Sequence, residues 1–196
     1  MSTAQRKIVE SDILSDADYQ ARRGELRAEA IAMKKNRRVE VGPFATFYFE
    51  SYQTMWLQVH EMLRIEKGGK GQIAGELEAY NPLIPQGAEL IATLMLEIED
   101  AARRDRTLRT LGDIEESAFL DLDGERIKGR PTEYEDRTTA EGKTSSVHWL
   151  RFEFTPAQIA KFKTGQAVLG FTHPNYGHMA VISPAVREEL AKDFAH

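Results

Sequence analysis

The sequence contains no cysteine among its 196 residues. This absence excludes disulfide bonds, thiolate catalysis, iron–sulfur clusters and cysteine-ligated zinc sites on the chain. The sequence also has no apolar run approaching the roughly 20 residues of a membrane-spanning helix, and its first residues lack the apolar core of a signal peptide. We therefore expect a cytoplasmic protein that has no membrane segment and takes no part in thiol chemistry.

Two further features are absent: a strong excess of one charge and a linker between domains. The formal net charge is only −5, so the molecule as a whole shows no electrostatic signature of nucleic-acid binding. No stretch rich in Pro, Gly and Ser divides the chain, and its 41% hydrophobic content can form one substantial core. We predict a single domain over residues 1–196, with a flexible segment over 1–14 and a long polar loop over 131–145.

Hydrophobic periodicity and capping residues predict the order of helices and strands. Helices are expected over residues 16–36, 52–66, 73–80 and 101–112, and after Thr155 and Ser183. Ser15 and Asp100 are the expected caps of the first and fourth of these helices. Strands are expected within residues 39–50, 88–99, 118–129, 147–154, 166–173 and 178–182, and Asp123-Gly124 predicts a β-hairpin turn within 118–129. Because hairpins predominate and the helices are interspersed irregularly, the pattern favours an α+β fold with a mostly antiparallel sheet and helices packed against it.

The segment VHEMLRIE, residues 59–66, differs by one residue from the H-E-x-x-H signature of zinc proteases. His60 and Glu61 match the signature, but Arg64 occupies the position of the second histidine. An arginine side chain keeps its proton and has no lone pair to offer a metal ion. The sequence therefore predicts no metal site on this helix.

The polar side chains of the same helix suggest a different role. At 100° per residue, Gln58 and Glu66 fall within the apolar arc, where each would need a partner, and His60, Glu61 and Arg64 fall on the opposite side. One interpretation is a solvated face with a structural hydrogen-bonded network. The other is a small polar pocket that Arg151 or His148, from the strand at 147–154, completes.

His148 is ambiguous in the same way, because it shares a strand face with apolar residues but lies next to the long polar loop. These patterns assign no catalytic residues, and we expect no cofactor. The candidate ligand-binding residues are Gln58, Glu61, Arg64, Glu66, His148 and Arg151.

Two weaker patterns also have structural explanations. Residues 34–38 place four cations at the end of a predicted helix, where the helix dipole favours positive charge, although the same run could bind an anion or nucleic acid. His173 and His178 flank a predicted turn and could hold a metal ion between them, but two histidines without a third ligand are usually ordinary turn residues.

Several motifs in order resemble an uncharacterised bacterial family of unknown function: KKNRRVEVGP, FYFESYQTMWLQVHEMLRIE, YNPLIP, ELIATLMLEI and SSVHWLRFEF, with HPNY a weaker match. The resemblance covers about residues 16–191. Members commonly carry glutamine in place of His60, and their genes commonly lie beside those of a rubrerythrin-like protein and an iron–sulfur oxidoreductase. The resemblance implies a redox context and possible partners of these kinds, but no mechanism.

Two functional hypotheses of different classes follow. The first is a non-enzymatic accessory or binding protein of a redox or peroxide-response system. The second is a metal-dependent or small-molecule enzyme whose pocket uses the polar residues of the 56–66 helix, since carboxylates and histidine can bind iron or manganese and Arg64 can clamp an anion. Nucleic-acid binding through residues 34–38 is a weaker third hypothesis.

Overall fold

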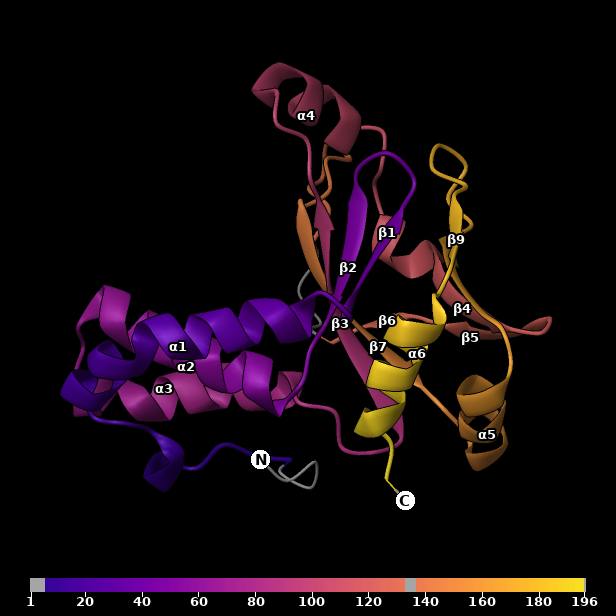
Figure 1. Cartoon of the computed structure of the whole chain (residues 1–196). Helices are drawn as coiled ribbons and strands as arrows, with labels where there is room; N and C mark the ends of the chain where they lie inside the picture. Colours follow the sequence, from indigo (N-terminus) through magenta and orange to yellow (C-terminus); the bar gives the residue numbers. More distant parts are fainter. Residues whose placement is uncertain (1–5, 133–136, 196) are drawn as a thin grey trace.

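Two antiparallel β-sheets form the centre of the molecule (Figure 1). The computed structural model describes residues 6–132 and 137–195. The first sheet has the strand order β1 (Arg38–Val41), β2 (Ala45–Phe49), β3 (Glu89–Leu96), β7 (Val147–Glu153) and β6 (Arg130–Pro131). The second has the order β5 (Glu125–Lys128), β4 (Ala118–Leu122), β8 (Ala167–Phe171) and β9 (Met179–Val181).

The main hydrophobic core lies between the two sheets. Alternate residues of β3, among them Leu90 and Leu94, share this core with Phe152 of β7 and with Leu120 and Leu169 of the second sheet, and all five are fully buried. The intervening β3 residue Ile91 points to the other face of the first sheet and belongs to a second apolar cluster. The central strand of the first sheet is therefore buried on both faces.

Three helices form the layer that covers this other face and extend from the sheet as one arm (Figure 1). They are α1 (Asp16–Lys34), α2 (Tyr52–Glu66) and α3 (Lys70–Tyr80). α2 lies nearest the sheet, because Tyr52, Met55 and Val59 form the second apolar cluster with Ile91. We call α1, α2 and α3, together with residues 6–15, the helical unit.

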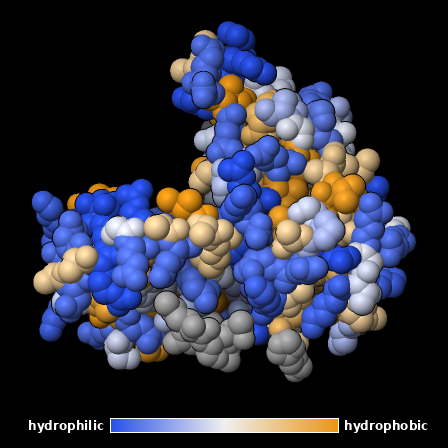
Figure 2. All heavy atoms as spheres, in the orientation of Figure 1, coloured by the Kyte–Doolittle hydropathy of each residue, from blue (hydrophilic) through white to orange (hydrophobic). Residues whose placement is uncertain are grey.

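The remaining helices are short and connect or cap the sheets. They are α4 (Ala101–Leu108), α5 (Pro156–Thr164) and α6 (Pro184–Leu190), with 3₁₀ turns η1 (Glu10–Asp12), η2 (Asn81–Leu83), η3 (Ile114–Ser117) and η4 (Ala191–Asp193). The predicted helix caps are present, since Ser15, Asp100, Thr155 and Ser183 each accept a bond from a backbone N–H of the first turn. Hydrophilic side chains cover much of α1 and α4 in Figure 2.

The predicted α+β class with antiparallel pairing is confirmed, with the strands divided between two sheets. Positive φ angles at Asp123 (53°) and Gly124 (88°) produce the predicted hairpin between β4 and β5. The helix expected to begin at Ile73 begins three residues earlier, at Lys70. No helix within the described residues is long and apolar enough to cross a membrane.

The chain segments expected to be flexible are only partly described. Residues 1–5 and 133–136 lie outside the described residues. Residues 6–14 pack against the helices of the helical unit. Ile8 is fully buried there, and its backbone exchanges two hydrogen bonds with the Asn81 amide. Residues 137–146 form a folded turn closed by a bridge between Thr138 and Thr144.

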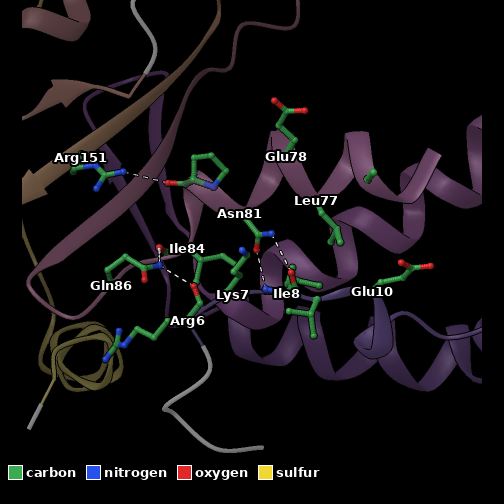
Figure 3. Close-up of a pocket in the computed structure, with 13 residues that line it drawn as sticks. Arg6, Lys7, Ile8, Glu10, Leu77, Glu78, Asn81, Ile84, Gln86 and Arg151 are labelled. Carbon is green, nitrogen blue, oxygen red and sulfur yellow. Dashed lines mark hydrogen bonds between the residues drawn. The ribbon is translucent and has the colours of Figure 1, made fainter. Parts of the chain in front are cut away.

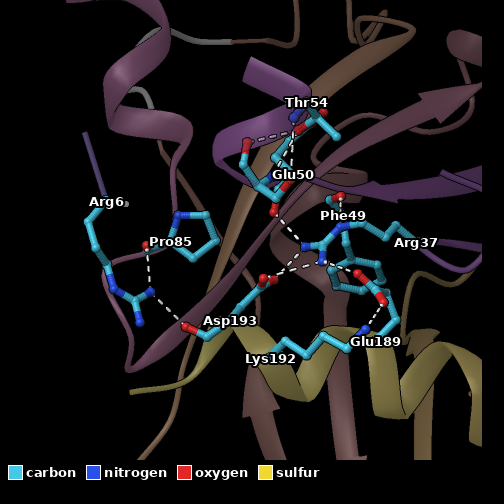
Figure 4. A network of polar contacts seen from close by, with 10 residues as sticks. Arg6, Arg37, Phe49, Glu50, Thr54, Pro85, Glu189, Lys192 and Asp193 are labelled. Atoms are coloured by element: carbon cyan, nitrogen blue, oxygen red, sulfur yellow. Dashed lines mark hydrogen bonds and ion pairs between the residues drawn. The ribbon is translucent and has the colours of Figure 1, made fainter. Parts of the chain in front are cut away.

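Arg37 links the first sheet to the C-terminal helices (Figure 4). Its guanidinium donates to the carbonyl oxygens of Phe49 and Glu50, at 3.0 and 2.8 Å, and pairs with the carboxylates of Asp193 and Glu189. The residue is 2% exposed. Burial raises the pKa of Asp193, and the nearby Arg37 partly offsets this shift. The 34–38 run is therefore not a free basic stripe, because one of its four cations is internal.

We predict that Arg37→Leu destabilises the protein by roughly 3–5 kcal/mol, because it strands the buried carboxylate of Asp193. Arg38→Leu is the matched control, since the Arg38 side chain is 50% exposed and its loss should cost less than about 0.5 kcal/mol. Urea denaturation of the two variants measures the difference. Equal losses of stability would contradict the central role of Arg37.

Candidate functional site

The imidazole of His60 is an internal connector of the helical unit. The side chain is 2% exposed, Nδ1–H donates to the Trp56 carbonyl oxygen at 2.8 Å, and Nε2 accepts from the Leu14 backbone N–H at 3.0 Å. Burial lowers the pKa of His60, which keeps the ring neutral. The expectation that His60 lies on a solvated face was wrong, because residues 6–15 and α1 cover that side of α2.

Glu61 ties α2 to α1. Its carboxylate accepts from the Tyr19 hydroxyl at 2.5 Å and from two nitrogens of Arg23 at 2.8 and 3.0 Å. Arg64 donates to the same carboxylate at a longer 3.4 Å. The Arg23 hydrogen bonds are the main cause that lowers the pKa of Glu61 to about 2. Glu61 is therefore an ionised and fully engaged acceptor, which agrees with the predicted polar network.

Glu66 and Gln58 do not lie in the interior as the helical-wheel argument placed them. Glu66, the last residue of α2, is exposed and accepts a bond from the Gln72 side chain of α3 at 2.6 Å. Gln58 is half-buried and makes one long contact, 3.5 Å, with the Tyr80 hydroxyl. The prediction that both are buried was wrong, because α3 packs beside only part of the arc that a single-helix projection treats as interior.

Burial predicts that substitution of His60 costs more stability than substitution of Glu66. We predict that His60→Ala costs on the order of 3 kcal/mol, since it leaves the Leu14 N–H without its acceptor and opens a void beside Tyr19 and Trp56. Glu66→Ala should cost no more than about 0.5 kcal/mol. Thermal and chemical denaturation decide between the two orders. A larger loss in the Glu66 variant would sink this assignment.

A cavity of about 1090 Å³ opens in the helical unit, between the start of α1, the end of α2 and the start of α3. This volume reaches the upper end of the usual range for small-molecule sites, about 300–1,000 Å³. Its apolar lining comes from Ile13, Leu14, Leu63 and Ile73. Its charged lining comes from Arg64, Lys67, Lys70, Glu10 and Asp16. We call it the helical-unit cavity.

Arg64 is the sequence-predicted candidate that lines this cavity. Its Nε atom is buried and has no hydrogen-bond partner among the described residues. A buried donor of this kind normally has a hydrogen-bond partner. The helix dipole explains why a cation lies near the end of α2, but it does not explain why one N–H group of Arg64 has no partner. Glu61, which holds Arg64 at 3.4 Å, belongs to the wall behind it.

The first turn of α3 adds to the positive character of the cavity. Gly69 precedes this helix without a side-chain cap, and both Gly69 and Lys70 line the cavity. Uncapped backbone N–H groups and the helix dipole favour a negative group at this end. Lys67, in the left-handed conformation with φ 55°, completes the turn between α2 and α3. Arg64, Lys67, Lys70 and this helix end together form the cationic side of the cavity.

The other two candidate residues lie elsewhere. His148 of β7 is paired with Leu94 and faces the core between the sheets, on the side of the first sheet opposite to α2. Arg151 lines a groove of about 660 Å³ beside the N-terminal segment (Figure 3), where it donates to the Pro82 carbonyl oxygen at 3.2 Å. Gln58, Glu66 and His148 therefore do not converge on one pocket.

The two histidines of the β8–β9 connection have other partners. His173 Nε2 contacts the Gly112 carbonyl oxygen at 3.1 Å and its Nδ1 accepts from the Asn175 N–H at 3.2 Å. His178 packs edge-on against the ring of Tyr176. Within residues 6–132 and 137–195, no group of three or more His, Asp or Glu side chains is placed to hold a metal ion.

The cavity residues missed by the sequence reasoning are Lys67, Lys70 and Tyr19. Lys67 and Lys70 fall between the two helices predicted over 52–66 and 73–80, and Tyr19 falls within the helix predicted over 16–36. Their common signal is position, because each lies at or near a helix end that a short turn brings beside Arg64. Spacing along one helix does not contain this information.

The comparisons with known proteins identify relatives but no activity. A family model described as Protein of unknown function (DUF3501) matches residues 7–194. A solved structure of a novel protein of unknown function from Burkholderia pseudomallei K96243 is 37% identical, with a TM-score of 0.89. The match covers 96% of this chain and 100% of that chain. No curated protein is similar to the chain.

Proposed function

The chain belongs to the DUF3501 family, and we propose that it is a ligand-binding protein whose helical-unit cavity holds a small organic anion with an apolar body. The observation that carries this proposal is the cationic side of a large cavity, where Arg64, Lys67 and Lys70 line the wall beside the uncapped start of α3. A carboxylate is the group that best matches an arginine edge, because it accepts two parallel N–H bonds.

The mixed lining of the cavity supports an amphipathic ligand. Leu63 and Ile73 offer apolar contact close to Arg64 in the chain, and Ile13 and Leu14 contribute the same from the N-terminal segment. Glu10 of η1 and Asp16 of α1 also line the cavity, so the lining carries three positive and two negative side chains. A single anionic group would sit at the Arg64 side, away from these two carboxylates.

The polar groups beside the cavity favour binding over catalysis. Both nitrogens of His60 are engaged, and the ionised Glu61 already accepts from three side chains. Burial and the bond to Glu61 raise the pKa of the Tyr19 hydroxyl, which makes it a poor source of a phenolate. A general base needs a free lone pair within reach of the substrate, and these three groups do not offer one.

We predict that decanoate binds to the protein and that Arg64→Gln weakens this binding roughly 10- to 100-fold, corresponding to about 1.5–3 kcal/mol for a charged hydrogen bond. Arg22→Gln is the matched control, since Arg22 lies on the exposed side of α1 and does not line the cavity. Calorimetric titration and amide chemical shifts measure affinity and place.

A neutral ligand, decanol, and a variant with a narrowed cavity, Ile73→Trp, separate the possible outcomes of this titration. Decanol should bind the unmodified protein more weakly than decanoate does. It should bind the Arg64→Gln variant as tightly as it binds the unmodified protein. Ile73→Trp, which places a bulky ring in the cavity, should weaken the binding of both. Equal affinity of the Arg64 and Arg22 variants for decanoate, or unchanged binding after Ile73→Trp, would overturn the proposal.

The accessory role in a redox system, in the cytoplasm, is the second part of the proposal. It rests on the genes that commonly neighbour this family, those of a rubrerythrin-like protein and an iron–sulfur oxidoreductase. We predict that the full chain retains at least one of these two proteins in a pull-down at moderate salt. Retention of neither, with the cavity shown to bind its anion, would leave the ligand-binding role and remove the redox one.

A further inference from the structure

Glu115 of η3 and His148 of β7 form a buried pair remote from the helical-unit cavity. Glu115 is 6% exposed and His148 is 1% exposed. Glu115 Oε2 and His148 Nδ1 are 3.4 Å apart, and neither atom has a hydrogen-bond partner elsewhere in the described residues. Two buried polar atoms that face one another without a bond need an explanation.

The other nitrogen of the imidazole fixes the position of its proton. Nε2 lies 2.9 Å from the Ser145 carbonyl oxygen and 3.3 Å from the Thr144 hydroxyl. A carbonyl oxygen only accepts, so Nε2 must carry a hydrogen and donate it to Ser145. In the neutral ring, Nδ1 then carries a lone pair, which is directed at Glu115.

An ionised Glu115 would therefore place a second acceptor against this lone pair in a buried site. One proton between the two atoms removes the conflict, because the carboxylic acid then donates to Nδ1. Burial acts in the same direction on both groups: it raises the pKa of Glu115 and lowers that of His148 to about 4. The uncharged arrangement, with the proton on Glu115, follows from both observations.

We propose that Glu115 and His148 share one proton at neutral pH, and that this proton clasps residues 137–146 onto the first sheet and α4. His148 holds Ser145 and Thr144 directly. The Thr144 backbone N–H donates to the Leu108 carbonyl oxygen at 3.1 Å, and the Thr138 hydroxyl accepts from the Asp113 N–H at 3.0 Å. We call residues 137–146 the clasped segment.

Other charged groups face the clasped segment and must be separated from the pair. On η3 these are Asp113 and Glu116, and on the segment they are Arg137, Glu141 and Lys143, with Arg137 acting electrostatically on both members of the pair. On α4, Asp105 pairs with Lys143 and Arg109, whose bonds lower its pKa to about 2, so it stays ionised throughout the range considered. His173 contacts Gly112, just before η3.

Proton counting gives a specific pH profile for release of the clasped segment. A released pair titrates near the ordinary values of 4.5 for Glu and 6.5 for His. Between these values the released pair holds one proton, as the clasped pair does, so release is independent of pH. Above 6.5 the released pair holds none, and release becomes up to tenfold more favourable per pH unit until Glu115 itself ionises in place.

The acid side of the profile has the opposite sign and a different origin. Below 4.5 the released pair binds two protons and the clasped pair only one, so release again becomes more favourable as the pH falls. The loss of protection that this release causes ends near pH 4, where His148 is protonated in place and both facing atoms become donors. A flat region with a fall in protection on either side is the signature of one shared proton.

We predict that the hydrogen-exchange protection factor of the Thr144 amide is constant between about pH 4.5 and 6.5 and falls up to tenfold per pH unit from 6.5 to 8. Glu115→Gln should remove the fall above 6.5, because its amide donates to Nδ1 at any pH. Glu116→Gln is the matched control, since Glu116 is 52% exposed and pairs with Lys128, and it should keep the fall. His173→Gln should keep it as well.

Two measurements on the unmodified protein test the proposal even where a variant does not fold. The infrared spectrum at pH 7 should contain a protonated carboxyl band, and nitrogen NMR should show His148 as the neutral Nε2–H form. Protection that stays level from pH 6.5 to 8, or the absence of a protonated carboxyl at pH 7, would overturn the shared proton. A fall that persists unchanged in Glu115→Gln would assign the effect to another group.

Discussion

Burial of the first sheet on both faces is the constraint on which the rest of the structure depends. β3 contributes Leu90 and Leu94 to the core between the sheets and Ile91 to the cluster beneath α2. Neither face can be left to water, so the second sheet and the helical unit are both required. Every polar side chain that enters these layers must then find its partner inside the protein, because a buried group without one costs about 1–3 kcal/mol or more.

Three buried ionisable residues meet this requirement in different ways. Arg37 is surrounded by carbonyl oxygens and two carboxylates, which joins the C-terminal helices to the sheet. Glu50 accepts from the hydroxyls of Thr93 and Thr54, both at 2.6 Å, which joins the start of α2 to β3. At Glu115, the Oε2 atom faces the lone pair of the His148 imidazole and has no hydrogen-bond donor among the described residues. Proton sharing is consequently needed at Glu115, and at the other two sites donors are already in place.

The sequence was sufficient for elements whose signals are local. The caps at Ser15 and Thr155, the Asp123–Gly124 turn and the alternation of β7 each depend on residues within a few positions, and each was found where it was predicted. The environment of His60 was not predictable in this way, because its acceptor role is set by Leu14, 46 positions away. The prediction for Glu66 was wrong for the same reason, since the packing of α3 decides which part of the apolar arc of α2 is covered. The site residues therefore depended on tertiary contacts that no helical projection contains.

The clasped segment touches both faces of β7, which relates the two parts of the molecule. At its start, the Arg137 guanidinium lies 4.5 Å from the ring centre of Trp149, a residue packed against the apolar cluster of the helical unit. Near its end, Thr144 and Ser145 contact His148 on the opposite face. Strand alternation makes this possible, because neighbouring residues of β7 point in opposite directions. A change in the proton held by His148 and Glu115 therefore acts on a segment whose other end already contacts the helical side of the sheet. Transmission between the faces requires two arrangements of that segment, and the shared proton supplies a free-energy difference between them.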